Sequence, residues 1–228
     1  MKLLKLDQVT LISVTSVELP ATELALMISM HDIEFGSVKL LTSEEFVSQD
    51  AQIEVIKIPK LSFEGYSKFV LNELHKYVNT EFCLVIQADG FILNAHRWQE
   101  KFLEYDYIGA PWPKILTLAG GPDQMLVMQN QVGNGGFSLR SKRLLLETAN
   151  INFDDLTFPT KSEDLIICHF LHEEMLKRGI AFPAPEFAAQ FSIESKYASY
   201  GQTPKTSFGF HGKSLRDLIF NSINNNSD

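Results

Sequence analysis

The segment Phe82-Cys83-Leu84-Val85-Ile86-Gln87-Ala88-Asp89-Gly90 joins an almost continuous apolar run to an acidic residue close behind it. An apolar run of this kind predicts a strand that is covered on both faces, as the inner strands of parallel sheets are. Ligands of open parallel sheets bind at the carboxyl ends of the strands, so Asp89 is a candidate for holding a divalent cation. Asp89-Gly90 between two apolar runs equally fits a hairpin turn, and this alternative stays open.

The chain before this segment alternates between strand and helix patterns. Apolar, β-branched runs predict strands over residues 9–14, 38–41 and 53–58. Helical spacing of apolar residues predicts a helix over 21–30 and an amphipathic helix over 66–78. The sequence Thr42-Ser43-Glu44-Glu45 fits a capping box and predicts one more helical turn. This order predicts an α/β fold with a mostly parallel sheet flanked by helices.

The second half of the chain follows a different pattern. Residues 117–131 form a long connection rich in Gly, Gln and Met, and such connections are often functional or mobile. The pattern then predicts a strand over 136–140, a helix over 141–148, and a helix over 164–178 that Gly179 ends in a left-handed conformation. Because neither a repeat nor a linker is evident, we expect one domain over residues 1–220 and a polar tail over 221–228.

Composition excludes several classes of protein. With 228 residues and 45% hydrophobic content, the chain can bury a sizeable core. A net charge of -8 leaves no diffuse basic surface for a phosphate backbone, so nucleic acid is not expected as a partner. No stretch approaches the roughly 20 apolar residues of a transmembrane helix. Cys83 and Cys168 each have apolar neighbours, which suits reduced thiols in a cytoplasmic protein.

Three glycines within four residues mark Gly133-Asn134-Gly135-Gly136 as a segment that a ligand can approach closely. It is not a P-loop, because no Lys-Ser or Lys-Thr pair follows, and Ser138 breaks the dinucleotide-binding pattern. A plain turn at Asn-Gly is the alternative. Arg140, Lys142 and Arg143 follow the segment and suit either contacts with a diphosphate or a solvated basic face.

Two acids, Glu163 and Asp164, precede an apolar helix. Acids in the first turn stabilise a helix, which is the structural interpretation. The functional interpretation is that one of them faces a cleft and acts as a general base. The pair offers one acid for each task.

Three histidines are candidates for metal binding. His169 and His172 are three residues apart on one predicted helix, but no acid or cysteine lies at the spacing of a known zinc motif, so we interpret them as core or surface residues. His211 differs because aromatic residues and glycines surround it in a segment with little predicted structure. A buried structural histidine is the alternative there.

Taken together, four strings of the sequence resemble a family of bacterial and fungal proteins of formerly unknown function that is classed as glycosyltransferase-like. The strings are Leu84-Val-Ile-Gln-Ala-Asp-Gly-Phe91, Tyr105-Asp-Tyr-Ile-Gly-Ala-Pro-Trp112, Val132-Gly-Asn-Gly-Gly-Phe-Ser-Leu-Arg-Ser141 and Ser162-Glu-Asp164. The resemblance spans roughly residues 8 to 212. It implies a GT-A-like, Rossmann-like sheet that binds a nucleotide-sugar.

The resemblance also implies roles for individual residues. Asp89 matches the last position of the Asp-x-Asp metal motif, and Gln87 stands where the first acid of that motif is expected. Asp164 is implied as the base, with Glu163 beside it, and His211 as a metal-binding histidine. Mn²⁺ or Mg²⁺ is the implied cofactor, although the neutral Gln87 is a weaker cation ligand. The glycine segment would border the transferred sugar and the acceptor.

From these assignments we expect an inverting glycosyltransferase with a UDP-linked donor and a glycan or lipid-linked acceptor. The residues expected to surround the nucleotide are Thr15, Ser16, Thr42, Tyr66, Ser67, Gln87 and Asp89. Trp112 is expected either to stack on a sugar ring or to anchor the core. The expected location is the cytoplasm, with peripheral contact at the inner face of the membrane left open. A catalytically silent sugar- or nucleotide-binding subunit of a polysaccharide assembly complex is the alternative function.

Overall fold

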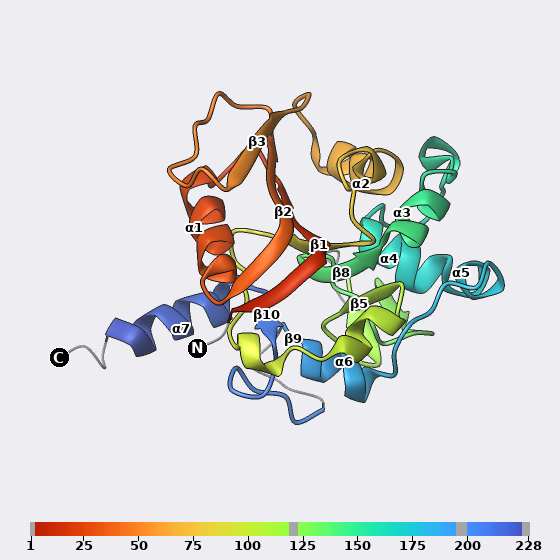
Figure 1. The fold of residues 1–228 in the computed structure, drawn as a ribbon. Coiled ribbons are helices and arrows are strands. Elements are labelled where there is room, and N and C mark those ends of the chain that lie inside the picture. The colour runs from red at the N-terminus through yellow and green to blue at the C-terminus, as the bar shows by residue number, and fades with distance from the viewer. Residues whose placement is uncertain (1–2, 119–122, 195–199, 225–228) are drawn as a thin grey trace.

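The computed structural model describes residues 3–118, 123–194 and 200–224. Its centre is a six-stranded sheet in the order β3-β2-β1-β4-β8-β5 (Figure 1). The strands are β1 (Leu4–Val14), β2 (Ile33–Thr42), β3 (Ile53–Lys57), β4 (Phe82–Ile86), β5 (Tyr107–Gly109) and β8 (Phe137–Ser141). The first four strands in this order pair in parallel, whereas β8 is antiparallel to both β4 and β5. The predicted α/β fold with a mostly parallel sheet is therefore confirmed.

Helices cover both faces of this sheet. They are α1 (Leu19–Met30), α2 (Phe63–Asn72), α3 (Lys142–Thr148), α4 (Glu163–Leu165), α5 (His172–Lys177), α6 (Pro185–Phe191) and α7 (Lys213–Asn224). In β4, Leu84 packs in the same core cluster as Leu26 of α1. The next residue, Val85, packs in a cluster with Val70 of α2, because successive side chains of a strand point to opposite faces. This double burial explains the continuous apolar run with which β4 was predicted.

The prediction of a helical turn at residues 42–45 is wrong. Thr42 is the last residue of β2, and its Oγ1 accepts a hydrogen bond from the backbone N of Glu44 at 3.2 Å. The chain continues through bends and an irregular loop to β3. By accepting this bond, the threonine hydroxyl closes a local turn with the residue two positions ahead. A turn of this kind competes with helix formation, so a sequence that fits a capping box here forms a turn.

Two other elements differ from the sequence prediction. The amphipathic helix starts before residue 66, because Ser62 Oγ accepts a hydrogen bond from Gly65 N at 3.0 Å and caps α2. A separate 3₁₀ turn follows over Leu74–Lys76. Strand β5 was not predicted, since it has only three residues and no alternating pattern.

The helix expected over 164–178 is present but is not regular. It consists of α4, a π-helical segment at Ile166–Phe170, and α5. Its end is as predicted, because Gly179 has φ 79° and Ile180 N donates to Met175 O at 2.9 Å. π-helical insertions are rare and are found mostly at functional sites.

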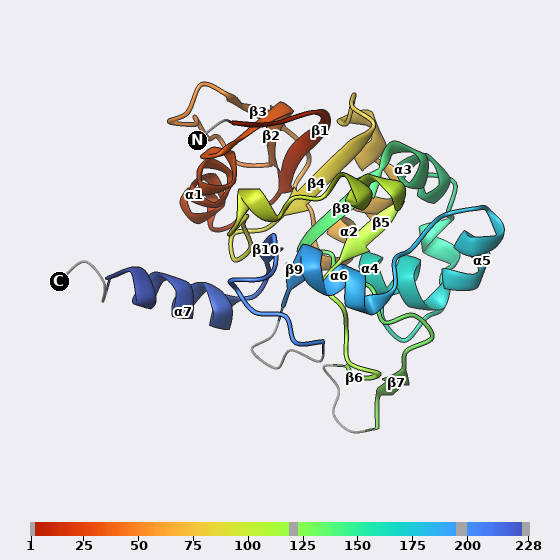
Figure 2. The same cartoon turned by 60° about the horizontal axis from the view of Figure 1, so that its bottom comes forward.

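The C-terminal segment returns to the edge of the sheet through two short parallel strands, β9 (Ser192–Ile193) and β10 (Gly209–Phe210). Helix α7 then projects from the body, as does the hairpin of β6 (Ile115–Thr117) and β7 (Met125–Val127) (Figure 2). The expected tail boundary at residue 220 falls inside α7, and residues 225–228 lie outside the described part. Within the described ranges, none of the helices combines the length and apolar character needed to cross a membrane.

Gly109 allows the glycine segment to pack directly on β5. A Cβ at this position would lie 1.9 Å from the carbonyl oxygen of Gly133. We predict that Gly109→Ala lowers the free energy of unfolding by about 2 kcal/mol or more, because backbone must move to make room. Chemical denaturation measures this change. Gly65→Ala is the control, since its Cβ would meet no backbone atom and approaches only the side chains of Ser62, at 3.1 Å, and Leu61, at 3.8 Å. Equal effects of the two variants would contradict the prediction.

Candidate functional site

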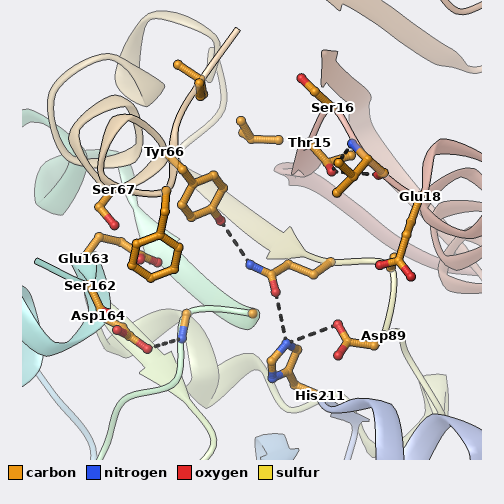
Figure 3. Close-up of a pocket in the computed structure, with 18 of the residues that line it drawn as sticks. Thr15, Ser16, Glu18, Tyr66, Ser67, Asp89, Ser162, Glu163, Asp164 and His211 are labelled. Carbon is orange, nitrogen blue, oxygen red and sulfur yellow. Dashed lines mark hydrogen bonds and ion pairs between the residues drawn. The ribbon is translucent and has the colours of Figure 1, made fainter. Parts of the chain in front are cut away.

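A cavity of about 550 Å³ opens at the carboxyl ends of β1 and β4 (Figure 3). Its walls come from residues 14–18 after β1, from the start of α2, from residues 87–89 after β4 and from 162–164 at the start of α4. Because β8 is antiparallel to β4, the loop that precedes β8 reaches the same edge of the sheet. We call this loop, Gly133–Gly136, the glycine loop. The cavity therefore collects segments that are far apart in the sequence.

At one side of the cavity, Gln87, Asp89 and His211 form a polar cluster. His211 Nε2 lies 3.1 Å from Gln87 Oε1 and 3.3 Å from Asp89 Oδ1. Gly212 N donates to Asp89 O at 2.9 Å, so the backbone that follows β10 is fixed against the end of β4. Asp89 and His211, which are far apart in the sequence, therefore lie side by side at this end of the cavity.

Charge pairing stabilises the ionised forms of this cluster. Burial opposes the charge on His211, but interactions with the nearby carboxylates of Asp89 and Glu194 outweigh it and raise the pKa of His211 to about 9. Burial likewise opposes ionisation of Asp89, and the nearby imidazolium outweighs it, so the pKa of Asp89 is lowered. Glu194 Oε1 lies 3.6 Å from the other ring nitrogen, Nδ1, of His211. The histidine is held by a carboxylate on each side.

Gln87, Asp89 and His211 are the residues of this cluster that could hold a divalent cation, and His211 would have to release the proton of Nε2 to do so. Two ligands bound at right angles to Mg²⁺ or a similar ion lie about 3 Å apart, which matches the separations of His211 Nε2 from Gln87 Oε1 and Asp89 Oδ1. Metal-binding histidines usually donate their second ring N–H to a carboxylate, and Glu194 lies on that side of His211 at 3.6 Å without forming a hydrogen bond. The described residues contain no set of three acidic, histidine or cysteine ligands, so water and a bound ligand would complete the coordination.

The glycine loop lies against both sides of the cavity. A Cβ at Gly136 would lie 2.1 Å from His211 Nε2, and one at Gly135 would lie 2.2 Å from Glu163 Oε1. Only glycine permits these approaches. Consecutive residues of the loop therefore contact the His211 cluster and the acids of α4.

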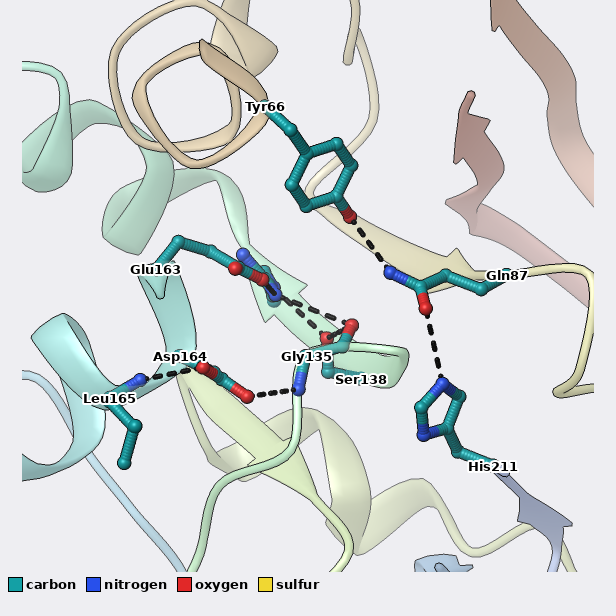
Figure 4. Close-up of polar contacts among 9 residues, drawn as sticks. Tyr66, Gln87, Gly135, Ser138, Glu163, Asp164, Leu165 and His211 are labelled. Atoms are coloured by element: carbon teal, nitrogen blue, oxygen red, sulfur yellow. Dashed lines mark hydrogen bonds and ion pairs between the residues drawn. The ribbon is translucent and has the colours of Figure 1, made fainter. Parts of the chain in front are cut away.

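Glu163 forms a buried ion pair with Arg140 of β8. Arg140 Nη2 lies 2.9 Å from Glu163 Oε1, and both side chains are at most 7% exposed. Arg140 also donates through Nε to Ser138 Oγ at 3.0 Å, and Ser138 Oγ donates to Gly135 O at 3.1 Å (Figure 4). The pair thus supports the glycine loop from behind. Glu163 therefore has a structural role, and the neighbouring acid, Asp164, takes no part in this ion pair.

Asp164 is held by two backbone donors. Gly135 N donates to its Oδ2 at 3.0 Å and Leu165 N donates to its Oδ1 at 2.8 Å (Figure 4). Burial and the negative charge of Glu163 nevertheless raise the pKa of Asp164 to about 7. An oriented carboxyl group with a pKa near neutrality, lining a cavity, has the properties of a general base.

The hydroxyl of Tyr66 connects the start of α2 to the polar cluster. Gln87 Nε2 donates to Tyr66 Oη at 3.3 Å (Figure 4). Burial raises the pKa of Tyr66 well above its usual value, so the hydroxyl keeps its proton. Thr15 and Ser16 use their hydroxyls locally, in bonds to Val17 O and from Ser43 N. Ser16 Oγ only accepts in these bonds, from Ser43 N and Ser43 Oγ, so its own proton remains for another partner.

The structure brings most of the predicted site residues together. Those that line the cavity are Thr15, Ser16, Tyr66, Ser67, Gln87, Asp89, Asn134, Gly135, Gly136, Glu163, Asp164 and His211. Thr42 does not line the cavity where it was expected, and Trp112 takes the second of its two expected roles, that of a core anchor. Thr42 is fully buried at the end of β2, and Trp112 is an anchor of the second core cluster, with its ring against Gly133.

The basic residues after the glycine loop do not line the cavity either. Arg140 is buried in the ion pair, Lys142 donates to the carbonyls of His75 and Val78, and Arg143 donates to Arg178 O. His169 and His172 lie on the segment after α4, where burial lowers the pKa of both. Neither residue lines the cavity.

Some cavity residues were not found by sequence reasoning. Glu18, Phe63, Glu194 and Lys213 all line the cavity. Glu18 follows the end of β1, so its position on the carboxyl edge of the sheet was a usable signal. Phe63 is 76% exposed at the first turn of α2. No sequence pattern marks Glu194 or Lys213, because the short β9–β10 pairing brings them there.

Comparison with known proteins shows the family to which the chain belongs and a solved structure that shares its fold. The model of a family described as "Protein of unknown function (DUF5672)" matches residues 50–211. The chain belongs to this family. That match spans the glycine loop, the two acids and His211, so the DUF5672 model covers the centre of the cavity. No curated protein matches the chain.

A solved structure shares the fold of this DUF5672 protein. It is the crystal structure of a glycosyltransferase involved in the glycosylation of the major capsid of PBCV-1, with a TM-score of 0.51 and 13% sequence identity. The match covers 94% of this chain and 98% of the other. The chain therefore has a glycosyltransferase-like fold along nearly all of its length.

Loss of the buried ion pair is expected to destabilise the protein. We predict that Glu163→Ala lowers the free energy of unfolding by about 3 to 5 kcal/mol, because it leaves the Arg140 guanidinium buried and uncompensated. Chemical denaturation measures the effect. The double variant Arg140→Met/Glu163→Leu is the control, and its stability is expected to lie closer to that of the wild type. A single variant as stable as the wild type would contradict the structural role.

Proposed function

We propose that this protein is a glycosyltransferase that moves a sugar from a nucleotide-sugar, UDP-linked in our proposal, to a hydroxyl of a glycan or lipid-linked acceptor. The observation that carries the proposal is the convergence of a carboxylate–histidine cluster and a hydrogen-bonded acid on one cavity. Sugar transfer needs both, since charge develops on the leaving diphosphate while a proton leaves the acceptor. The fold shared with a glycosyltransferase supports the same reaction class.

The nucleotide is assigned to the side of the cavity formed by β1 and the start of α2. Apolar side chains of Val14, Val17, Ile58, Leu61 and Phe63 line this side and suit the faces of a base. Tyr66 accepts its hydrogen bond from Gln87, which leaves its own proton for a ligand. The diphosphate then lies toward Asp89 and His211, the polar end of the same cavity.

Asp89 and His211, with Gln87, would hold Mn²⁺ or Mg²⁺ at this polar end. When bound, the cation would supply positive charge that stabilises the leaving diphosphate. Lys213, whose Nζ lies 3.8 Å from Glu18 Oε1, also lines this end and adds a cationic group. The protein contributes the orientation of the donor and the exclusion of water from the reacting bond.

Asp164 is assigned as the general base. Its carboxylate takes the proton of the acceptor hydroxyl while that oxygen bonds to the anomeric carbon, and the bond from this carbon to the diphosphate breaks. Attack from the face opposite the diphosphate inverts the anomeric configuration. Two backbone donors fix the carboxylate, and its pKa of about 7 suits proton transfer at neutral pH. Glu163 serves this step by positioning the loop that binds Asp164.

Replacement of the base is expected to remove turnover without unfolding the protein. We predict that Asp164→Asn lowers the transfer rate about 10²- to 10⁴-fold, the typical contribution of a general base. Nucleotide release in the presence of donor and acceptor measures the rate, and circular dichroism checks the fold. A wild-type rate in the variant would remove Asp164 from the mechanism. Donor binding by the wild type with no turnover on any acceptor would instead favour the silent binding subunit.

The rate is expected to depend on pH through the ionisation of Asp164. Because the base acts as a carboxylate, the transfer rate rises with pH below about 7 and becomes level above it. A profile of kcat/KM between pH 5.5 and 8.5, the range about this pKa, measures the dependence. The residual rate of Asp164→Asn provides the control and is expected to be flat in the same range. A wild-type profile that falls with rising pH through neutrality would contradict the assignment.

Cation binding is expected to depend on Asp89. Mn²⁺ should raise the melting temperature of the wild type, since a ligand of the folded state stabilises it by mass action. Asp89→Asn should lose most of that increase, because an amide oxygen is a weaker ligand than a carboxylate. Asp154→Asn is the matched control, as Asp154 pairs with Lys68 on the surface. An equal increase in all three proteins would place the cation elsewhere.

A further inference from the structure

The glycine loop has one side chain, that of Asn134, and this side chain has an unusual position. Asn134 is 5% exposed and has φ 60°, in the left-handed region that favours glycine. Its Oδ1 is buried and accepts no hydrogen bond, and among the described residues its amide has no recorded hydrogen-bond partner. Buried polar atoms of folded proteins are nearly always hydrogen-bonded. An unpartnered amide beside a cavity points to a ligand.

Packing explains why the other three positions of the loop are glycine. A Cβ would collide with the Trp112 ring at Gly133, with Glu163 at Gly135 and with His211 at Gly136. None of these reasons applies at residue 134, where glycine would relieve the left-handed backbone at no steric cost. The loop therefore carries an amide at the single position that can hold a side chain, although that side chain forms no bond within the protein.

A second asparagine of the same segment shows the contrast. Asn130 donates from Nδ2 to Val132 O at 2.8 Å and accepts from Val132 N at 3.2 Å, so its amide closes a local turn. The amide of Asn134 has no such task. The hydrogen bonds within the loop explain why residue 130 is an asparagine, but no such bond explains the asparagine at residue 134.

The position of the loop indicates which ligand group the amide meets. Gly136 lies against His211 at the diphosphate end, and Gly135 donates to Asp164 at the base end. In the proposed reaction, the transferred sugar extends from the diphosphate to the base, so its ring is the part of the donor that reaches the base end, where Asn134 lies beside Gly135. Asn134 lines the cavity next to Gly135, and its free Oδ1 can only accept a hydrogen bond. The group it meets must therefore be a donor, as a sugar hydroxyl is.

We propose that Asn134 is a specificity-determining residue whose side-chain amide binds a hydroxyl of the donor's sugar ring. This inference rests on the proposed function and adds the residue that distinguishes a nucleotide-sugar from the nucleotide alone. Sites built to bind a hydroxyl reject analogues that lack it, because the protein group is then left unpaired. Asn134 makes the enzyme selective for donors that carry this hydroxyl.

The test compares Asn134→Gly with the wild type by calorimetry and thermal unfolding. The probes are UDP and the commercially available UDP-sugar that raises the wild-type melting temperature most. We expect Asn134→Gly to keep or raise the melting temperature of the free protein, since glycine suits the left-handed backbone. We also expect about tenfold weaker binding of the UDP-sugar, with binding of UDP unchanged. Asn130→Gly is the matched control and is expected to lower the melting temperature while preserving the ratio of the two affinities.

Each other outcome has a defined meaning. Unchanged affinity of Asn134→Gly for the UDP-sugar would overturn the inference and leave the proposed function intact. Equal weakening for UDP and the UDP-sugar, or a clear loss of stability, would also overturn it, because the side chain would then support the loop rather than the sugar. Failure of every UDP-sugar to stabilise the wild type would count against the UDP-linked donor itself. That result would overturn the inference together with its basis.

Discussion

The buried ion pair between Arg140 and Glu163 is the interaction on which the rest of the site depends. It links β8 to the start of α4, and through Ser138 it supports Gly135 of the glycine loop. A guanidinium that is fully buried requires a compensating charge, and Glu163 provides it. One acid of the tandem pair is thereby committed to structure. The other, Asp164, is left facing the cavity in an environment that favours its neutral form until about pH 7.

The glycine loop, which this ion pair supports, contacts the polar groups at both ends of the cavity. Its backbone touches Glu163 and Asp164 on one side and His211 on the other, which only residues without side chains allow. The groups proposed for proton acceptance and for diphosphate binding thus lie at neighbouring points of one continuous segment. A shift of the loop would change both ends of the cavity together. The site is therefore better understood as one unit than as separate motifs.

The sequence allowed much of the fold to be predicted because its strands are buried on both faces. The continuous apolar run of β4 and the helical spacing of α2 reflect burial directly, and both elements were found. Short elements such as β5 carry no periodic signal. The Thr42 pattern failed because a hydroxyl that can cap a helix can equally close a turn. Local sequence does not decide between these outcomes.

Within the site, residues at strand ends could be predicted and residues brought in by tertiary packing could not. Asp89 follows β4 directly, so its place on the carboxyl edge of the sheet came from the sequence pattern. Glu194 and Lys213 reach the cavity only because β9 and β10 pair across a long separation in sequence. The role of Glu163 as partner of Arg140 was equally invisible, since nothing in the sequence shows that Arg140 is buried.

A crystal structure with Mn²⁺ and a non-hydrolysable UDP-sugar tests the central claim most directly. We expect anomalous density for the cation between Asp89 and His211, and a sugar ring along the glycine loop with its anomeric carbon facing Asp164. A cation bound away from Asp89 and His211, or a sugar ring outside this cavity, would contradict it.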